Sequence, residues 1–409
     1  MFGGIFQGRK TKNIVKRTKK SCIETTFAYP LTIKSGAGCF LEDLDGKVYL
    51  DFNSNVCCCN VGYGHPEILE VIRNFSVLGA HKIAGQDFYT EEQVKLAEKV
   101  LKITPKNLTR ALFTNSGAEA VENALKFAYR KKGPLAGVSF FRAFHGRTLG
   151  ALSFTDSKAV QKKNYPEVNN ELIKFCTDDN DPDINQLEEL IKREAEPAFV
   201  IVECFQGEGG YRPGSKKFIK TLREVTKKHD VPLIFDEIQA GMGRTGKWWS
   251  FEHYGVEPDI MTAGKSLQVG AVVSSKKYDP NEPGAVSSTW GGGHRIDLAV
   301  GLKTIEIIEK EKLMDNASKI GDYIMKRFKE MQERYPKKIV DVRGLGLMIG
   351  VEFENEKQRD IVVQQSFKNK LLLLGCGFKT LRIAPPLTIK EDEVNQGLSI
   401  IEKIVRDLK

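Results

Sequence analysis

Residues 232–237 read Pro-Leu-Ile-Phe-Asp-Glu, and this stretch decides the fold class. Four uncharged residues are followed at once by two carboxylates, which is the pattern of a buried strand that ends at a polar edge. Other apolar runs of strand length occupy 110–114, 138–141, 199–202 and 259–262. Amphipathic segments with the period of a helix lie between several of these runs, for example at 91–102, 183–194 and 216–229. This alternation predicts an α/β fold with a mostly parallel sheet between helices.

The two ends of the chain are organised differently from this central region. Residues 38–41 and 48–50 flank an Asp-Gly turn, which predicts a small hairpin near the N-terminus. A helical pattern covers 297–335, and further strands and a closing helix from Glu391 predict a smaller α+β C-terminal domain. We therefore predict three parts: an N-terminal segment with its hairpin at 1–60, a large domain at 61–300 and a small domain at 301–409.

Composition narrows the function classes. The net charge is +9, but seven basic residues and no acid lie in the first twenty positions, and without them the net charge is +2. The body of the chain therefore does not have the charge of a nucleic-acid-binding protein. The basic tail predicts a short surface helix, with a transit peptide or a basic binding segment as alternatives. No run of about 18 uncharged apolar residues predicts a membrane helix.

The eight cysteines and six histidines give no metal-binding spacing, since no CxxC, HxH or HxxxH pair is present. We therefore predict no metal site. Free thiols used as small buried residues are typical of a reducing compartment, which predicts a cytoplasmic protein.

Polar side chains follow the predicted strands where each strand ends. They are Ser116-Gly117, Glu203, Asp236-Glu237 and Gly264-Lys265. In an open α/β sheet, ligands bind outside the carboxyl ends of the strands, so a site is expected there. Ser116, Gly117 and Ala118 open a helix, where they either bind a phosphate or form an ordinary N-cap. Lys265 is a candidate imine-forming amine or, alternatively, a surface charge.

Several longer motifs resemble one known family. They are Thr114-Asn-Ser-Gly-Ala-Glu-Ala-Val-Glu-Asn123, Phe144-His-Gly-Arg-Thr148, Glu203-Cys-Phe-Gln-Gly-Glu-Gly-Gly210, Phe235-Asp-Glu-Ile-Gln239, Gly264-Lys-Ser266 and Ser288-Thr-Trp-Gly-Gly292. Their order, with 29 residues from Asp236 to Lys265, resembles the class III, pyridoxal-phosphate-dependent aminotransferases of fold type I from about residue 28 to the C-terminus. The resemblance implies a transaminase with pyridoxal 5'-phosphate as its cofactor.

The same resemblance implies roles for individual residues around the cofactor. Lys265 would carry the cofactor and move a proton, and Asp236 would pair with the pyridine nitrogen. The other implied cofactor-binding residues are Ser116, Gly117 and Ala118 at the phosphate, Phe144 and Ile238 on the two ring faces, His145, and Gln239 at the ring hydroxyl. Thr289 would reach the phosphate of the neighbouring subunit, so that the family resemblance implies a homodimer with shared active sites.

The substrate residues that the resemblance implies bind or neutralise charged groups. Arg382 would bind the α-carboxylate of glutamate or 2-oxoglutarate, and Glu208 would neutralise Arg382 when the donor presents a terminal amine. Arg147 would bind the far carboxylate. Val56 and Glu203 are assigned to the pocket.

Finer motifs resemble two subgroups. Residues 248–254 and 375–382 resemble 4-aminobutyrate aminotransferases, whereas 264–270 and 382–387 resemble L-lysine 6-aminotransferases. The resemblance therefore predicts transfer of the terminal amino group of an ω-amino acid of these types to 2-oxoglutarate, giving a semialdehyde and glutamate. The alternatives are an ornithine or acetylornithine aminotransferase, or an amino-acid racemase or aminomutase on the same scaffold. The sequence departs from the family pattern at 267–270 and 291–294, which the resemblance places at the border of the substrate pocket.

Overall fold

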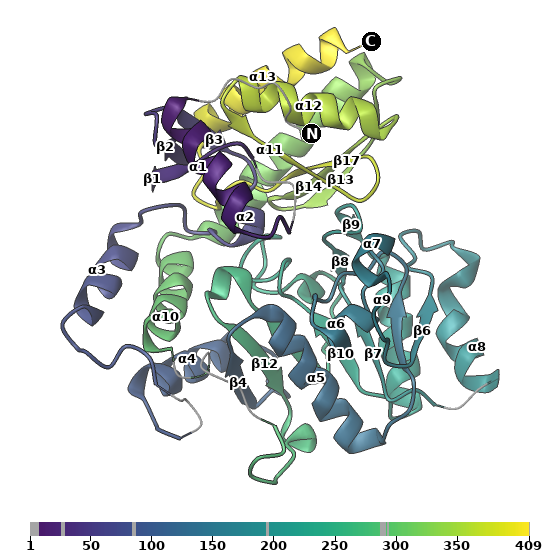
Figure 1. Cartoon of the computed structure of the whole chain (residues 1–409). Helices are drawn as coiled ribbons and strands as arrows, with labels where there is room; N and C mark the ends of the chain where they lie inside the picture. The colour runs from purple at the N-terminus through teal and green to yellow at the C-terminus, as the bar shows by residue number, and fades with distance from the viewer. Residues whose placement is uncertain are drawn as a thin grey trace.

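The computed structural model describes residues 8–25, 29–83, 87–193, 196–286, 292 and 294–408 (Figure 1). Its largest sheet has seven strands in the order β4-β12-β11-β10-β7-β5-β6. These strands are β4 (Arg110–Thr114), β5 (Gly137–Phe140), β6 (Asn170–Ile173), β7 (Phe199–Val202), β10 (Leu233–Asp236), β11 (Ile260–Ala263) and β12 (Gly270–Ser274). Six of the seven strands run in one direction and β12 runs in the opposite direction, so the predicted α/β fold with a mostly parallel sheet is confirmed.

Alternate residues of each central strand belong to different hydrophobic clusters. Val200 and Val202 of β7 join one cluster, while Phe199 and Ile201 join the other. Helix α5 (Gly117–Lys132) covers the second face, and α4 (Glu91–Lys102), α8 (Gln186–Arg193) and α9 (Lys216–Lys228) contribute to the first. Burial on both faces explains why these strands are apolar throughout and do not alternate.

The C-terminal residues form a second, antiparallel sheet in the order β13-β14-β17-β16. Its strands are β13 (Ile339–Leu345), β14 (Met348–Phe353), β16 (Leu374–Cys376) and β17 (Thr380–Ile383). The accompanying helices are α11 (Leu313–Arg334), α12 (Glu356–Lys368) and α13 (Glu391–Asp407). Figure 1 shows these elements together with the N-terminal strands on one side of the large sheet. This is the α+β unit that the sequence predicts.

The predicted N-terminal hairpin is present as β2 (Phe40–Asp43) and β3 (Val48–Asp51), with β1 (Ile33–Ala37) beside β2. Strand β15 (Leu371–Leu372) pairs in parallel with β3, so that N-terminal and C-terminal segments share one sheet. The basic tail forms the predicted surface helix α1 (Arg9–Ser21), whose first N–H groups donate to Asp45. The domain boundaries at 60 and 300 stay a prediction.

The remaining elements are two longer helices, of 10 and 16 residues, and several short helices, strands and turns. They are α2 (Ser54–Cys57), α3 (Pro66–Phe75), α6 (Leu149–Ser153), α7 (Ala159–Lys162), α10 (Arg295–Lys310), β8 (Phe205–Gln206), β9 (Arg212–Pro213), and the 3₁₀ turns η1 (Pro182–Asn185), η2 (Ser250–His253), η3 (Lys265–Leu267) and η4 (Lys276–Tyr278). No helix within the described ranges is long and apolar enough to cross a membrane.

The helical pattern over 297–335 forms two helices and not one long helix, because the chain breaks between α10 and α11. Lys312 has a φ of 53°, which turns the chain out of the right-handed helix. The break lets α10 pack on α3 and α4 while α11 packs on β13. Neither glycine nor proline marks this position in the sequence, so tertiary packing decides it.

Replacing Lys312 with glycine should stabilise the protein, because glycine adopts a positive φ without the steric cost that a lysine Cβ carries. We expect Lys312→Gly to raise the free energy of unfolding by about 1 kcal/mol. Lys319→Gly, an exposed position inside α11, is the matched control and should lower it by about 1 kcal/mol. Urea unfolding of both variants measures the difference, and a loss of stability in Lys312→Gly would contradict the explanation of the break.

Candidate active site

The carboxyl ends of the parallel strands bring the predicted residues together. Because β4, β5, β7, β10 and β11 all run in one direction, the segments that follow them meet at one edge of the large sheet. Asp236 closes β10, Lys265 follows β11, Ser116 follows β4, Glu203 follows β7, and Phe144 lies in the loop after β5.

Asp236 is a buried carboxylate held by three donors. Its Oδ2 accepts a hydrogen bond from Nδ1 of His145 at 2.8 Å. Its Oδ1 accepts from the Thr262 hydroxyl at 3.2 Å and from the Ile238 N–H at 3.1 Å. These contacts fix the orientation of the carboxylate. His145 lies against Asp236 and is itself buried, so it is placed to position the carboxylate, and its own contact with the cofactor stays a prediction.

Ser116 is the N-cap of α5, since its Oγ accepts the N–H of Glu119 at 3.2 Å. The N-cap role that the sequence left open is thus confirmed. The helix still offers an anion site, because first-turn N–H groups have no partner within a helix. A Cβ added at Gly117 would lie 2.9 Å from Cδ1 of Ile238, so a larger residue here would displace the Ile238 side chain. Phosphate binding by Ser116, Gly117 and Ala118 stays a prediction.

Lys265 lies at the start of the turn η3, which joins β11 to the antiparallel β12. Its φ is 48°, and the turn is closed by the N–H of Gln268 donating to the Lys265 carbonyl at 2.9 Å. A non-glycine residue in the left-handed region costs roughly 1–2 kcal/mol. The surrounding packing therefore imposes this conformation, which holds the lysine at the same sheet edge as Asp236.

Ile238 and Gln239 directly follow Asp236. Ile238 packs against both Gly117 and Gly264, which places its apolar side chain between the segments of Ser116 and Lys265. Gln239 is buried, and its Oε1 has no hydrogen-bond partner among the described residues. A buried amide oxygen without a partner is costly, and a ring hydroxyl of a bound cofactor would satisfy it. The polar and apolar groups of these residues therefore fit pyridoxal phosphate.

Glu203 is buried beneath the loops that carry Phe144 and Gly207. Its two oxygens accept the N–H groups of Phe144 at 3.0 Å and Gly207 at 2.9 Å. Burial, together with the nearby Asp236 charge, raises the pKa of Glu203 to about 7, although His145 opposes the shift. Glu203 thus fixes two loops of the site. Its predicted contact with substrate stays a prediction.

Glu208 and Arg382 form an ion pair, with 2.8 Å between Oε1 and Nη2. Arg382 is buried on β17, and its Nη2 also donates to the Gly375 carbonyl. Burial alone would raise the pKa of Glu208, but Arg382 and Lys265 outweigh it and the pKa lies below its ordinary value. Nε and Nη1 of Arg382 have no partner in the part of the chain that the structure describes, so the guanidinium can bind a second carboxylate.

Arg147 and Phe144 lie together, with the Arg147 guanidinium carbon 5.9 Å from the centre of the Phe144 ring. Arg147 is exposed, and no carboxylate of the described residues pairs with it. Its contact with the far carboxylate of a substrate stays a prediction. Thr289, predicted to reach the partner's phosphate, lies outside the described residues.

Val56 lies in a turn in which four consecutive residues, 54–57, have positive φ. Arg244, which the sequence analysis did not single out, fastens this turn. Its guanidinium is fully buried and donates to the Ser54 hydroxyl, the Asn60 side chain and the carbonyls of Leu347 and Pro385. An arginine within a glycine-rich loop is the one sequence signal of this role. The pocket contact of Val56 itself stays a prediction.

The described residues include no group of three or more His, Cys, Asp or Glu side chains that could hold a metal ion. All eight cysteines are free, and five of them are buried: Cys39, Cys57, Cys176, Cys204 and Cys376.

Lys265 in a strained turn, the buried Asp236 carboxylate and the N-terminus of α5 lie at one edge of the large sheet, which is the arrangement expected of a pyridoxal-phosphate enzyme. The family model "Aminotransferase class-III" matches residues 24–405, and the chain belongs to this family. It is therefore a transaminase of fold type I whose cofactor is pyridoxal 5'-phosphate. When bound, this cofactor takes up an amino group and withdraws electrons from the neighbouring carbon.

Three relatives illustrate the similarity. An acetylornithine aminotransferase of Archaeoglobus fulgidus is 36% identical over 393 residues, covering 95% of this chain and 99% of the relative. The solved lysine aminotransferase of M. tuberculosis, in its internal aldimine form, superposes with a TM-score of 0.89 at 26% identity, covering 96% and 98%. The ornithine aminotransferase of Toxoplasma gondii gives a TM-score of 0.89 at 26% identity, covering 98% and 96%.

Lys265→Ala should lower turnover by about 1,000-fold or more, because both the attachment point and the proton-transferring amine are lost. Pyridoxal phosphate should still bind noncovalently. Borohydride reduction of the wild-type holoenzyme followed by peptide mapping should place the cofactor on Lys265, and Lys276→Ala, an exposed control, should keep the label there. A label on another lysine would contradict the assignment.

Glu203→Gln should remove a pH-dependent component of stability. The pKa of Glu203 is raised from 4.5 to about 7 in the folded protein, so its contribution is complete below pH 4.5 and is lost as the pH rises to about 7. Over this window the free energy of unfolding of the wild type should fall by on the order of 3 kcal/mol relative to Glu203→Gln. Urea unfolding at pH 4.5 and pH 7.5 tests this, and parallel pH profiles would refute it.

Proposed function

We propose that this enzyme transfers the terminal amino group of an ornithine-type donor to 2-oxoglutarate, giving a semialdehyde and glutamate. The observation that carries the proposal is the ion pair between Glu208 and Arg382. With Glu208 in place, Arg382 presents no free charge to the primary carbon of a terminal amine. With Glu208 moved aside, Arg382 binds the α-carboxylate of glutamate or 2-oxoglutarate.

The similarity favours the ornithine and acetylornithine alternative over the 4-aminobutyrate or lysine type that the motifs first predicted. Acetylornithine aminotransferases recur among the relatives, and the solved structures include an ornithine aminotransferase and a lysine aminotransferase. Such donors carry a carboxylate far from the reacting amine, and the unpaired guanidinium of Arg147 suits that group. N2-acetylornithine is therefore the first donor to test, with ornithine second.

A donor panel tests the substrate class. Holoenzyme mixed with N2-acetylornithine, ornithine, lysine or 4-aminobutyrate should lose its cofactor absorbance fastest with N2-acetylornithine, and 2-oxoglutarate should restore it. Preference for 4-aminobutyrate would overturn the donor assignment. Isomerisation of an amino acid without consumption of 2-oxoglutarate would instead identify a racemase or aminomutase.

We also propose a homodimer in the cytoplasm. Exposed apolar side chains cluster in the segment around α3 and the start of α4, namely Leu69, Ile72, Val77, Leu78, Phe88, Tyr89 and Val94. Such a concentration is typical of a subunit interface. Free buried thiols agree with a reducing compartment. Sedimentation equilibrium would measure the mass, and a monomer would refute the shared-site part of the proposal.

The two charged residues should affect opposite half-reactions. Arg382→Ala should raise the activation free energy of the half-reaction with 2-oxoglutarate by about 2–5 kcal/mol. The reason is that the α-carboxylate loses its partner and Glu208 is left buried without a counter-charge. Glu208→Gln should slow the half-reaction of the terminal amine by about tenfold, since a neutral partner compensates Arg382 less well, and should spare the reaction with glutamate. Single-turnover kinetics of each half-reaction measure both effects. Equal slowing by Glu208→Gln would show that Glu208 is only structural.

A further inference from the structure

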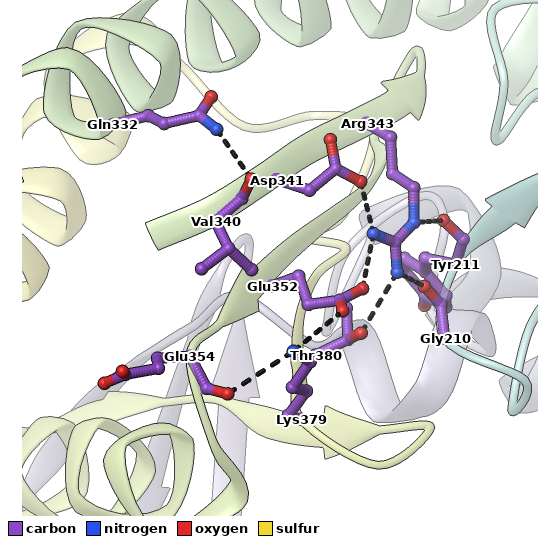
Figure 2. Close-up of polar contacts among 10 residues, drawn as sticks. All are labelled: Gly210, Tyr211, Gln332, Val340, Asp341, Arg343, Glu352, Glu354, Lys379 and Thr380. Atoms are coloured by element: carbon purple, nitrogen blue, oxygen red, sulfur yellow. Dashed lines mark hydrogen bonds and ion pairs between the residues drawn. The ribbon is translucent and has the colours of Figure 1, made fainter. Parts of the chain in front are cut away.

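Arg343 on β13 holds the chain just after Glu208 with two of its three guanidinium nitrogens (Figure 2). Its Nη2 donates to the Gly210 carbonyl at 2.7 Å and its Nε donates to the Tyr211 carbonyl at 3.1 Å. Nη1 faces Glu352 at 2.8 Å and Asp341 at 2.5 Å, and Nη2 also reaches the Thr380 hydroxyl. The two carboxylates orient and neutralise the guanidinium while its remaining N–H groups fix the loop.

Strand register explains why this arginine reaches that loop. Arg343 is paired with Gly350 of β14, and Gly350 is paired with Arg382 of β17. Residues directly opposite one another in antiparallel strands point to the same face, so both arginines project from one face with a glycine between them. A Cβ added at Gly350 would lie 3.0 Å from Cβ of Tyr211 and 3.2 Å from the Gly210 carbonyl oxygen. The loop therefore lies in the gap above Gly350.

The loop needs such support because its backbone is strained. Tyr211 is a buried, non-glycine residue with a φ of 50°, and Gly210 has a φ of 118°. On the other side of the ion pair, the Gly377 N–H donates to the Glu208 carbonyl at 2.8 Å. The Arg382 guanidinium lies 5.7 Å from the centre of the Tyr211 ring. Residues of the C-terminal sheet and its loops thus contact both the backbone and the side chain of Glu208.

We propose that Arg343 is a positioning residue that sets the balance between the two half-reactions. By fixing Gly210 and Tyr211, it holds the Glu208 carboxylate against Arg382 in the state that accepts a terminal amine. This role rests on the proposed exchange of partners by Arg382. Loss of Arg343 loosens the loop, so Glu208 neutralises Arg382 less completely. The state in which Arg382 binds a substrate carboxylate then becomes more populated.

The test compares Arg343→Met and Arg343→Lys with Arg327→Met as the matched control. Arg327 lies on α11 of the same unit and also donates to neutral oxygens, those of Tyr323 and Asn395, but it does not contact the loop. Gly350→Ala is a second perturbation, since it displaces the loop while leaving Arg343 in place. Thermal unfolding of each holoenzyme confirms folding before kinetics are measured.

The first readout is the ratio of single-turnover rates, terminal-amine donor over glutamate. This ratio should fall by about tenfold in Arg343→Met, because hydrogen bonds from a charged group are lost. It should also fall in Gly350→Ala and in Glu208→Gln. The ratio should be unchanged in Arg327→Met. Adding Arg343→Met to Glu208→Gln should produce little further change, because both act through one carboxylate.

The second readout is binding of glutarate, a dicarboxylate without an amine, measured by calorimetry with the holoenzyme. Glutarate competes with Glu208 for Arg382, so Arg343→Met should bind it several-fold more tightly, which mere destabilisation would not cause. One outcome overturns the role of Arg343 alone. In that outcome the rate ratio shifts in Glu208→Gln, but Arg343→Met changes neither the ratio nor the affinity for glutarate. An unchanged ratio in Glu208→Gln overturns the exchange at Arg382 and the role of Arg343 together.

Discussion

The ion pair between Glu208 and Arg382 links the chemistry of the site to the arrangement of its two sheets. Arg382 belongs to the C-terminal sheet, whereas Glu208 lies in the loop between β8 and β9, beyond the end of β7. Leaving a buried charge without its partner costs about 3–5 kcal/mol. Arg382 therefore needs a carboxylate at every stage, from Glu208 or from a substrate. In the function that we propose, this single requirement is what would let one pocket accept donors of different charge.

Several residues around this pair and around the predicted cofactor residues have left-handed backbone. Val56, Tyr211, Lys265 and Gln268 all have positive φ without being glycine. Contacts from distant parts of the chain hold two of these segments, with Arg244 at the turn that contains Val56 and Arg343 at Tyr211. The folded structure over-determines these conformations, which is how strained backbone persists at a site. The buried Arg244 and the partly buried Arg343 thus support the site as much as the residues that face its ligands do.

Much of the fold was accessible from the sequence because burial leaves a direct pattern there. The strands around Phe199, Leu233 and Ile260 are apolar throughout since helices cover both faces, and Asp236 and Lys265 stand at their polar ends. Strand β12 was missed because its apolar run is short and follows a tight turn without a helix between. The break at Lys312 was missed because it depends on packing between distant segments. Arg343 and Arg244 read as ordinary surface charges until the chain is folded around them.

The register of β13, β14 and β17 ties substrate recognition to loop support. Arg343, Gly350 and Arg382 are neighbours across three strands, and a shift of one residue would turn every side chain of a strand to the opposite face. Such a shift would remove the guanidinium that pairs with Glu208, the guanidinium that holds the loop, or the gap that the loop occupies. The position of the Glu208 loop is therefore specified by the pairing of the C-terminal sheet. Because one pairing fixes all three positions, their contributions to donor choice should be energetically coupled.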